Sequence, residues 1–557
     1  MTAELMVRNE ALDHIRAWLR KRHPKLREAD LDLDRDLIEY RVIDSLSFME
    51  FILYIEELRG REIDPTAVTA ASVRTLRSIC DTFFAELPAV DLRGSRSLED
   101  PAAMPPEDGQ ADQPLTHSQA NWYYYDLDHP ETTSWMMPTL LRIRGKLDTS
   151  RLTKAIEELV CRHDGLRIRL KIDGGAPRQS LVPPFVPDLP VTVLENQLDK
   201  DLWTAALEVV SQECARPADP EAGPPWRARL IRLDMDDHLL VITLAHILVD
   251  LEALIAIPNQ VALFYAALGD ESSLASVPYP PMQYSQFAAW HRAWLTSPEG
   301  LSQIQHRREQ LAGADEFNLG APFRTRNTKE EDRRLIPLPV ANQAESLAAE
   351  ERATSVVVGL SAYVAMLNRT FGHRDMTVSL NLGFRTKEAG RATTGVIGCF
   401  TNQQPLRISV DPKLSFRELV REVRPIVLDA FKHRYVPTRL ILDAQNPLDS
   451  PLAAVTFNWM NLTDYDDEAA EVQSSEVAMK PIILGLDEPT RSLYGGIAKH
   501  TALTIRAVRT KRGVETFLAT TVEVLGAGAA ARLGGDYERW FYATTTSPDR
   551  ALEELEV

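Results

Sequence analysis

The chain has 557 residues, of which 44% are hydrophobic and 25% are charged, a composition typical of a globular protein. This length exceeds what one hydrophobic core accommodates and predicts roughly two to four domains. The formal net charge of −18 argues against a nucleic-acid backbone or an anionic membrane surface as the main partner, because like charges repel.

The cysteines and the first residues bear on the cellular compartment. Cys80, Cys161, Cys214 and Cys399 are scattered, with no CxxC pair and no histidine at metal-ligand spacing. They predict reduced core thiols in a cytoplasmic protein and no metal site. Residues 1–22 are charged throughout and lack the apolar centre of a signal peptide. Since no window reaches about 18 uncharged apolar residues, we expect no membrane span.

The first 87 residues predict a small helical domain. The expected helices cover residues 7–22, 42–60, 68–73 and 75–86. Asp44 and Ser45 stand where the second helix begins, and Gly60 ends it. Apolar residues nearly encircle this helix and leave only a narrow acidic stripe, which predicts a mostly buried helix in a four-helix bundle.

This unit resembles an acyl or peptidyl carrier protein. The resemblance is carried by DSL at 44–46, the acidic helix after it, and the segment REIDPTAV before the third helix. It implies that Ser45 carries a 4′-phosphopantetheine arm, attached by a phosphopantetheinyl transferase, and that the acidic helix faces partner enzymes. Taken without the family, Asp44 and Ser45 are ordinary helix-capping residues. Val42 departs from the family pattern, because many acyl carriers have glycine there.

Residues 88–113 predict a linker. They are rich in proline, glycine and acidic residues and contain hardly any large apolar side chain, so they cannot form a packed core. A carrier domain tethered in this way meets its neighbour at a high effective concentration.

From residue 114 onward, strand and helix patterns alternate. The expected strands cover residues 139–145, 166–172, 227–233, 239–245, 376–382 and 453–460. The expected helices cover residues 149–162, 202–215, 251–268, 341–351 and 355–370, and a strand and helix follow within 515–541. These patterns predict an α/β enzyme with an N-terminal lobe (114–285), a C-terminal lobe (286–557) and a cleft between them.

The apolar run LLVITLAHILVDL at 239–251 ends in two polar residues, His246 and Asp250. A histidine and a carboxylate delivered by the end of a buried strand are candidates for an acyl-transfer centre. The same pattern fits a core histidine followed by a helix-capping aspartate, so this run does not decide between the two.

The chain from residue 114 resembles a condensation domain of non-ribosomal peptide synthesis. The matching stretches are LTHSQANWYYYDL (115–127), RHDGLRIRL (162–170), AHILVDL (245–251), YSQFAAW (284–290), VIGCFTNQQPLRI (396–408) and PLAAVTFNWMN (451–461). Their order implies a two-lobed fold like that of chloramphenicol acetyltransferase. Of the family motif HHxxxDG, the second histidine is His246 and the aspartate is Asp250, while Ala245 and Leu251 replace the first histidine and the glycine.

The resemblance also implies roles for individual residues. His246 is the expected catalytic residue, and Asp250 is its expected structural support through an ion pair with Arg162, or alternatively with Arg167. Asn402, Arg407, Asn458 and Asn461 are expected either to line the channel or to form core hydrogen bonds. Trp122 and the tyrosines 123–125 are expected to pack at the base of the lobes. The sequence places no cysteine or serine as a covalent nucleophile, so we expect direct transfer.

The expected function is transfer of a carrier-bound polyketide or peptidyl acyl group to an amine or alcohol in natural-product biosynthesis, such as antibiotic biosynthesis. No stretch resembles an adenylation domain, so we expect an upstream synthase or loading enzyme to supply the acyl group. The acceptor is expected as a small molecule or on a second carrier. Two alternatives remain: a catalytically silent docking platform for tailoring enzymes, and a coenzyme-A-dependent acyltransferase with a similar HxxxD motif.

Overall fold

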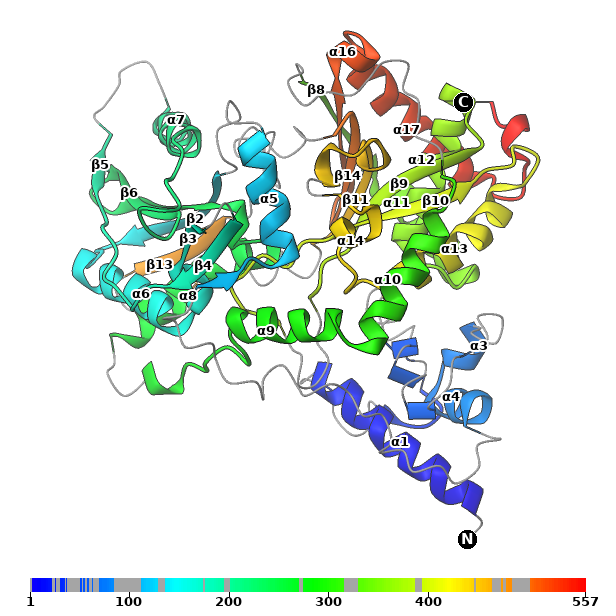
Figure 1. The fold of residues 1–557 in the computed structure, drawn as a ribbon, viewed down its shortest axis with the longest axis horizontal. Coiled ribbons are helices and arrows are strands. Elements are labelled where there is room, and N and C mark those ends of the chain that lie inside the picture. The colour runs from blue at the N-terminus through cyan, green and yellow to red at the C-terminus, as the bar shows by residue number, and fades with distance from the viewer. Residues whose placement is uncertain are drawn as a thin grey trace.

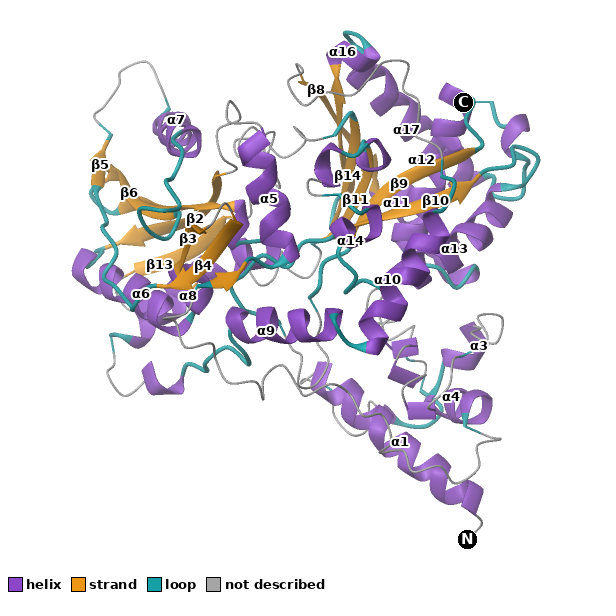
Figure 2. Cartoon of the chain, viewed as in Figure 1, coloured by secondary structure: helices purple, strands orange, loops and turns teal. Residues whose placement is uncertain are grey.

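The structure is a computed structural model. It describes residues 3–22, 26, 31–35, 37, 51–52, 54–55, 58–59, 63, 70–84, 112–128, 136–173, 176–194, 201–269, 274–314, 329–385, 393–444, 447–462, 472–473, 477–482 and 501–556. Two separate six-stranded sheets, each covered by helices, dominate the fold, and a small helical part contains the N-terminus (Figures 1 and 2). The mixed α/β architecture is therefore confirmed.

The N-terminal part contains the helices α1 (Ala3–Arg22), α3 (Ala70–Val73) and α4 (Leu76–Phe83). Ile15 and Leu19 of α1 pack in one apolar core with Leu76 and Phe83 of α4, as the amphipathic pattern predicts. Of the expected second helix, residues 51–52, 54–55 and 58–59 are described, and they are helical. Val42, Asp44 and Ser45 lie outside the described residues.

The first lobe is built on a sheet with the strand order β12-β13-β2-β7-β6-β5. Its strands are β2 (Met136–Gly145), β5 (Val191–Val193), β6 (Trp226–Asp234), β7 (Asp237–Ala245), β12 (Val472–Gln473) and β13 (Val477–Ile482). Its helices are α5 (His117–Asp128), α6 (Thr149–Arg162), α7 (Leu202–Ala215) and α8 (Leu251–Ala267). A small sheet of β1 (Gln113–Pro114), β3 (Ile168–Asp173) and β4 (Ala176–Leu181) adjoins it.

Strand β7 lies between β2 and β6 and is covered on both faces, which explains its unbroken apolar sequence. Leu239 and Val241 pack in the cluster formed with α7. Leu240, Ile242 and Leu244 point to the opposite face and join the main core of the lobe. The strand therefore holds its C-terminal end, and the residue after it, in a rigid position.

The predicted lobe boundaries need a correction. Strands β12 and β13 come from the expected C-terminal lobe, yet β13 pairs antiparallel with β2 of the first sheet, and β12 pairs with β13. Helix α9 (Tyr284–Leu295) also crosses the expected boundary at 285 and packs in the first core. A strand pattern in the sequence predicts that a segment is extended, but not which sheet edge it will join, so the two lobes were wrongly expected to be contiguous.

The second sheet has the strand order β10-β9-β11-β14-β15-β8. Its strands are β8 (Lys329–Pro337), β9 (Asp375–Asn381), β10 (Gln403–Ser409), β11 (Val455–Asn461), β14 (Leu503–Thr510) and β15 (Gly513–Thr521). The helices of this lobe are α11 (Leu338–Glu350), α12 (Ser355–Phe371), α13 (Phe416–Lys432), α16 (Val522–Leu525) and α17 (Ala529–Thr546). All five helices contribute to one core with these strands. Helices α10 (Pro298–Leu311) and α14 (Thr438–Leu442) lie beside β10.

Short 3-10 turns complete the described structure. They are η3 (Asp164–Arg167), η4 (His246–Leu248), η5 (Leu274–Ser276), η6 (Pro447–Asp449), η7 (Pro451–Ala453) and η9 (Leu552–Glu554).

The cysteines are free thiols, but Cys161 is exposed, so the expectation that all four lie in the core is wrong for it. Across the ranges described above, no helix is both long and apolar enough to cross a membrane.

Candidate active site

His246 begins the turn η4, directly after the last residue of β7. Its side chain is buried, with 8% of its surface exposed. The imidazole stacks on Trp122 of α5, with ring centroids 4.1 Å apart and an interplanar angle of 21°. The rigid strand behind it and the indole beside it fix the orientation of the ring. Trp122, which the sequence predicted only as packing, is therefore the immediate neighbour of the candidate base.

The surroundings of His246 favour its neutral form. Burial lowers its pKa from the ordinary value of 6.5, and the negative charge of Asp250 opposes this only in part. A neutral imidazole accepts a proton, whereas an imidazolium does not. The site thus holds a histidine in the protonation state that a general base requires near neutral pH.

Asp250 caps helix α8 and forms a buried ion pair. Its Oδ1 accepts a hydrogen bond from the backbone N–H of Ala253 at 2.9 Å, which places it at the N-cap of the helix. The guanidinium of Arg385 donates to both oxygens, from Nε to Oδ2 at 2.7 Å and from a terminal nitrogen to Oδ1 at 2.6 Å. Arg385 also donates to the carbonyls of Thr393 and Val396. Asp250 is therefore a structural anchor.

The expected partners of Asp250 were wrong. Arg162 donates instead to the carbonyls of Leu274 and Val277 and lies 3.4 Å from Glu158. Arg167 donates to the carbonyl of Val182. Arg385 was missed because it lies 135 residues from Asp250 and outside every stretch that carried the resemblance. Among many arginines, only the tertiary structure identifies the one that faces the carboxylate.

The two departures from the family motif lie on either side of this turn. Ala245 ends β7 and is buried. Leu251 begins α8 and packs against an apolar cluster that includes Ile255 of the same helix and Val508 of β14. A glycine at position 251 would make none of these side-chain contacts. Leu251 therefore adds an apolar contact between the turn that holds the site and the second sheet.

A cavity of about 690 Å³, counted with its open mouth, has His246 in its wall. Residues of α5 and η4 form one side, and residues of β9, β11 and β14 form the other. Asn402 and Asn458 line the cavity, as expected. Asn402 also donates to the carbonyls of Arg434 and Val436, so it has both expected roles. Arg407 pairs instead with Asp375, and the side chain of Asn461 lies outside the described residues.

The other stretches that carried the resemblance build the scaffold of this site. The hydroxyl of Tyr284 bonds with Thr116 and donates to the carbonyl of Cys399, each at 2.9 Å. The buried carboxylate of Asp164 accepts hydrogen bonds from the backbone N–H groups of Tyr284 and Ser285. A Cβ at Gly398 would lie 2.1 Å from the Tyr284 ring, so only glycine fits there. Four separate stretches thus meet around one tyrosine.

A second histidine cluster lies in the described part of the chain, away from this cavity. The Oδ1 atom of Asp429 on α13 lies 3.0 Å from Nε2 of His306 on α10. The backbone carbonyl oxygen of Asp429 lies 2.8 Å from Nδ1 of His433. Gln310 donates to the Asp429 carboxylate at 2.7 Å, and Arg307 lies 3.4 Å from the same oxygen. These contacts connect α10 with α13, and the guanidinium of Arg307 already lies beside the carboxylate of Asp429.

Two known peptide synthetases are similar to this chain in sequence. Phosphinothricin tripeptide synthetase PhsC of Streptomyces viridochromogenes is 29% identical over 350 residues, which cover 62% of this chain and 32% of the relative. Cyclosporin synthetase simA of Tolypocladium inflatum is 27% identical over 421 residues, covering 72% of this chain and 3% of the relative. The chain thus spans about a third or less of the length of these relatives.

A solved structure shares the fold and two family models match the sequence. The X-domain from teicoplanin biosynthesis superposes with a TM-score of 0.67 at 19% identity, covering 82% of this chain and 98% of that one. Residues 24–83 match the family model described as a phosphopantetheine attachment site, and residues 109–488 match the one described as a condensation domain. The chain therefore belongs to the condensation-domain family and carries a phosphopantetheine attachment domain before it.

Proposed function

We propose that the protein transfers an acyl group from a phosphopantetheine thioester on Ser45 to an amine or alcohol, with His246 managing the proton. The observation that carries this proposal is a buried, oriented and neutral histidine in the wall of a cavity that opens between the two lobes. A covalently linked carrier domain is the natural donor, because its tether raises the effective concentration of the arm.

The transfer needs one proton and one bond exchange. The nucleophile attacks the thioester carbonyl, so that a C–N or C–O bond forms and the C–S bond breaks. His246 accepts the proton of the nucleophile and returns it to the departing thiolate, which leaves as the free thiol of the arm. Asp250 and Arg385 act only by holding the turn. Positioning and proton transfer together suffice because a thioester is already activated.

The experiment is to acylate the arm and follow the loss of the acyl group. A phosphopantetheinyl transferase with butyryl-coenzyme A adds the arm, and intact-mass spectrometry checks the added mass, which Ser45→Ala must abolish. The loaded protein is then offered a panel of amines and alcohols. We expect His246→Ala to slow transfer by about 10²–10⁴-fold. His306→Ala, which removes a partly exposed histidine outside the cavity, is the matched control and should transfer like the parent.

A docking platform for another enzyme is the second candidate function. Ala245 and Leu251 favour it, because they depart from the family motif at the site itself. One structure of similar fold is the complex of the X-domain and OxyB from teicoplanin biosynthesis. A platform binds a partner protein without turnover, so a loaded parent that transfers to no acceptor supports this candidate. If His246→Ala transfers the acyl group as fast as the parent, His246 has no catalytic role.

A further inference from the structure

The second histidine cluster brings three metal-ligand atoms together from two helices. One ring nitrogen each of His306 and His433 and one carboxylate oxygen of Asp429 lie within 4.8 Å of one another. His306 belongs to α10, whereas Asp429 lies in the last turn of α13 and His433 caps that helix. Residues four apart share one helix face, and the rings of His433 and His306 meet with centroids 4.5 Å apart. The cluster could not be found in the sequence, because 123 residues separate His306 from Asp429.

The contact between His306 and Asp429 requires a cation between its two atoms. Nε2 of His306 lies 3.0 Å from Oδ1 of Asp429 and also 3.0 Å from the amide nitrogen of Gln310. With a proton, Nε2 faces the N–H donor of Gln310, and without one its lone pair faces a carboxylate, so no tautomer suits both neighbours. A metal ion bound to Nε2 and Oδ1 removes the repulsion between them. Gln310 then keeps its hydrogen bond to Oδ2, which measures 2.7 Å.

The kinds of ligand and their spacing indicate which ion fits. Two imidazole nitrogens and a carboxylate oxygen are typical ligands of zinc. Atoms bound to one tetrahedral zinc ion lie roughly 3.3 Å apart, because each bond measures about 2.0–2.2 Å. The nearest nitrogen-to-oxygen distances from Asp429 are 3.0 Å to His306 and 3.4 Å to Nδ1 of His433. Magnesium and calcium prefer oxygen ligands. Since the side chain of His306 is 43% exposed, an ion can enter from solvent in exchange for protons, and water can complete its coordination.

The guanidinium of Arg307 does not take the place of this ion. It lies 3.4 Å from Oδ2 of Asp429, whereas His306 faces Oδ1. Its other terminal nitrogen donates to the carbonyl of Pro405 at 2.9 Å, so Arg307 has a partner of its own. Carboxylates that bind metals are themselves hydrogen-bonded, and Arg307 fits that supporting role. Burial alone would raise the pKa of Asp429, but hydrogen bonds from its neighbours lower it, so the carboxylate is ionised at neutral pH.

The two helices contribute to different cores. Ile304 of α10 packs in the core of the first lobe, whereas Leu419 of α13 packs in that of the second. We propose that His306, Asp429 and His433 bind a zinc ion, which links the two lobes outside the cavity. This inference does not depend on the proposed function, because it concerns metal binding and stability and no step of the transfer.

The test measures metal binding by the full chain, without a polyhistidine tag and after treatment with a chelator. Cobalt(II) is the first probe, because its partly filled d shell absorbs visible light in a protein site. Zinc has a filled d shell, so zinc that displaces cobalt should remove the absorption. Zinc should also raise the midpoint of thermal unfolding, since a ligand that binds the native state stabilises it, and magnesium should not.

Variants assign the binding to these residues. Loss of a residue that only orients a metal ligand costs about 10- to 100-fold in affinity, so we expect His306→Ala and His433→Ala to weaken zinc binding by at least about 100-fold. Both should lose the cobalt absorption and the thermal stabilisation. Cys161→Ser removes an exposed thiol that could bind zinc by itself, and His373→Ala removes a histidine outside the cluster. These two controls should bind zinc like the parent.

Several outcomes overturn the zinc site. They are a parent that binds zinc no better than His306→Ala, binding that is lost in Cys161→Ser, and equal stabilisation of the parent by magnesium. If His433→Ala does not fold, His306→Ala decides alone, because its side chain is largely exposed and circular dichroism checks its fold. Transfer by His306→Ala is measured without added zinc. Failure of the zinc site and failure of the transfer reaction are therefore separate results.

Discussion

His246 combines burial, a stacked aromatic neighbour and a lowered pKa. Each of these has a cause in the fold. His246 directly follows the last residue of β7, a strand covered on both faces, so its side chain has little freedom to move. Trp122 covers one face of the imidazole ring. A histidine constrained in this way loses little entropy when a substrate arrives, which is an advantage for proton transfer in a defined direction.

The lowered pKa predicts how transfer depends on pH. A general base works in its neutral form, which persists below pH 6.5 because burial lowers the pKa of His246. We expect the transfer rate to stay constant as pH falls through 6.5 and to decline only at lower pH. An alcohol acceptor is suitable for this measurement, since it does not titrate in the range, and circular dichroism checks that the fold persists. A decline centred above pH 6.5 would contradict the prediction.

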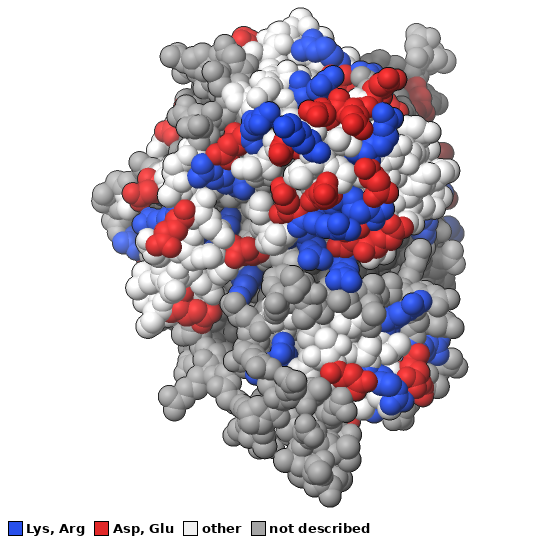
Figure 3. Space-filling view, turned by 90° about the vertical axis from the view of Figure 1, so that its right-hand side faces the viewer, with Lys and Arg blue, Asp and Glu red and all other residues white. Residues whose placement is uncertain are grey.

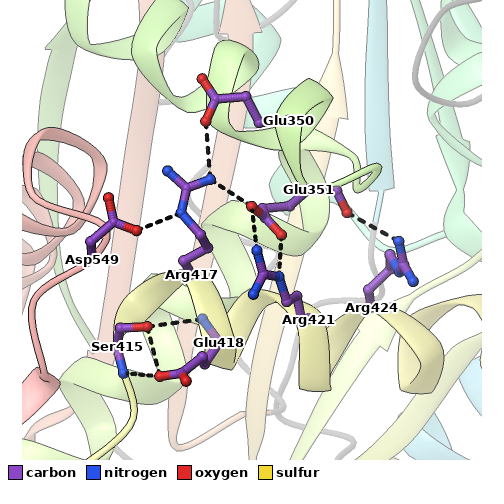
Figure 4. A network of polar contacts seen from close by, with 8 residues as sticks. All are labelled: Glu350, Glu351, Ser415, Arg417, Glu418, Arg421, Arg424 and Asp549. Carbon is purple, nitrogen blue, oxygen red and sulfur yellow. Dashed lines mark hydrogen bonds and ion pairs between the residues drawn. The ribbon is translucent and has the colours of Figure 1, made fainter. Parts of the chain in front are cut away.

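At the scale of elements, ion pairs join α11 to α13 in the second lobe (Figure 4). Glu351, at the end of α11, accepts hydrogen bonds from Arg417 and Arg421, and its backbone carbonyl accepts one from Arg424. These arginines recur every three or four residues and so share one face of α13.

Positive and negative side chains are interspersed over the face of the molecule seen in Figure 3, and neither sign forms a continuous patch there.

This network predicts a stability effect that depends on pH. Burial alone would raise the pKa of Glu351, but hydrogen bonds from Arg421 and Arg417 lower it below 4.5. We expect Glu351→Gln to lower the free energy of unfolding by about 1–3 kcal/mol at neutral pH, since it leaves buried donors poorly paired. A carboxylate with a lowered pKa stabilises the fold above its unfolded pKa and loses this effect as pH falls. The difference between the variant and the parent should therefore shrink below about pH 4.

Glu350→Gln is the matched control for this measurement. Glu350 is the neighbouring residue, but its side chain is 59% exposed and it contacts only Arg417 within the described network. An exposed ion pair contributes about 0–1 kcal/mol, so the control should unfold nearly like the parent. Thermal unfolding followed by circular dichroism at several pH values makes the comparison. Equal destabilisation in the two variants would show that burial of Glu351 is unimportant.

At the scale of the whole molecule, the site depends on contacts between segments far apart in the chain. Asp250 follows a strand of the first sheet, whereas Arg385 follows β9 of the second sheet. The Leu251 cluster joins the same turn to β14 and β15. Strand β13 returns from the second half of the chain to pair with β2. The cavity wall is therefore assembled only when both lobes have folded.

The ion pair between Asp250 and Arg385 gives a prediction at this scale. Arg385→Ala leaves the buried carboxylate without its cation, which typically costs about 3–5 kcal/mol, and it frees the turn that holds His246. We expect a lower midpoint of thermal unfolding and slower transfer. Arg407→Ala is the control, because Arg407 forms a similar two-pronged pair with Asp375 in which both side chains are about one-third exposed. Transfer at the parental rate in Arg385→Ala would contradict an anchoring role.

The sequence by itself determined the local structure and the identity of the candidate base. The expected helices 149–162 and 202–215 coincide with α6 and α7, because amphipathic spacing and flanking residues act over a few turns. The run before His246 predicted a buried strand, and β7 confirms it. The family was also indicated by sequence alone, because six separate stretches occur in the order that is typical of it.

Only the tertiary structure decided which distant residues meet. Arg162, Arg167 and Arg385 are chemically equivalent in a sequence, and the choice among them depends on how the two lobes pack. The cavity is lined by residues of β9, β11 and β14, and their alignment follows from strand register, which sequence periodicity does not encode. The resemblance to the family motif thus indicated His246 from the sequence, but its anchor Arg385 could not be predicted, because the ion pair with Asp250 forms through a contact between residues far apart in the chain.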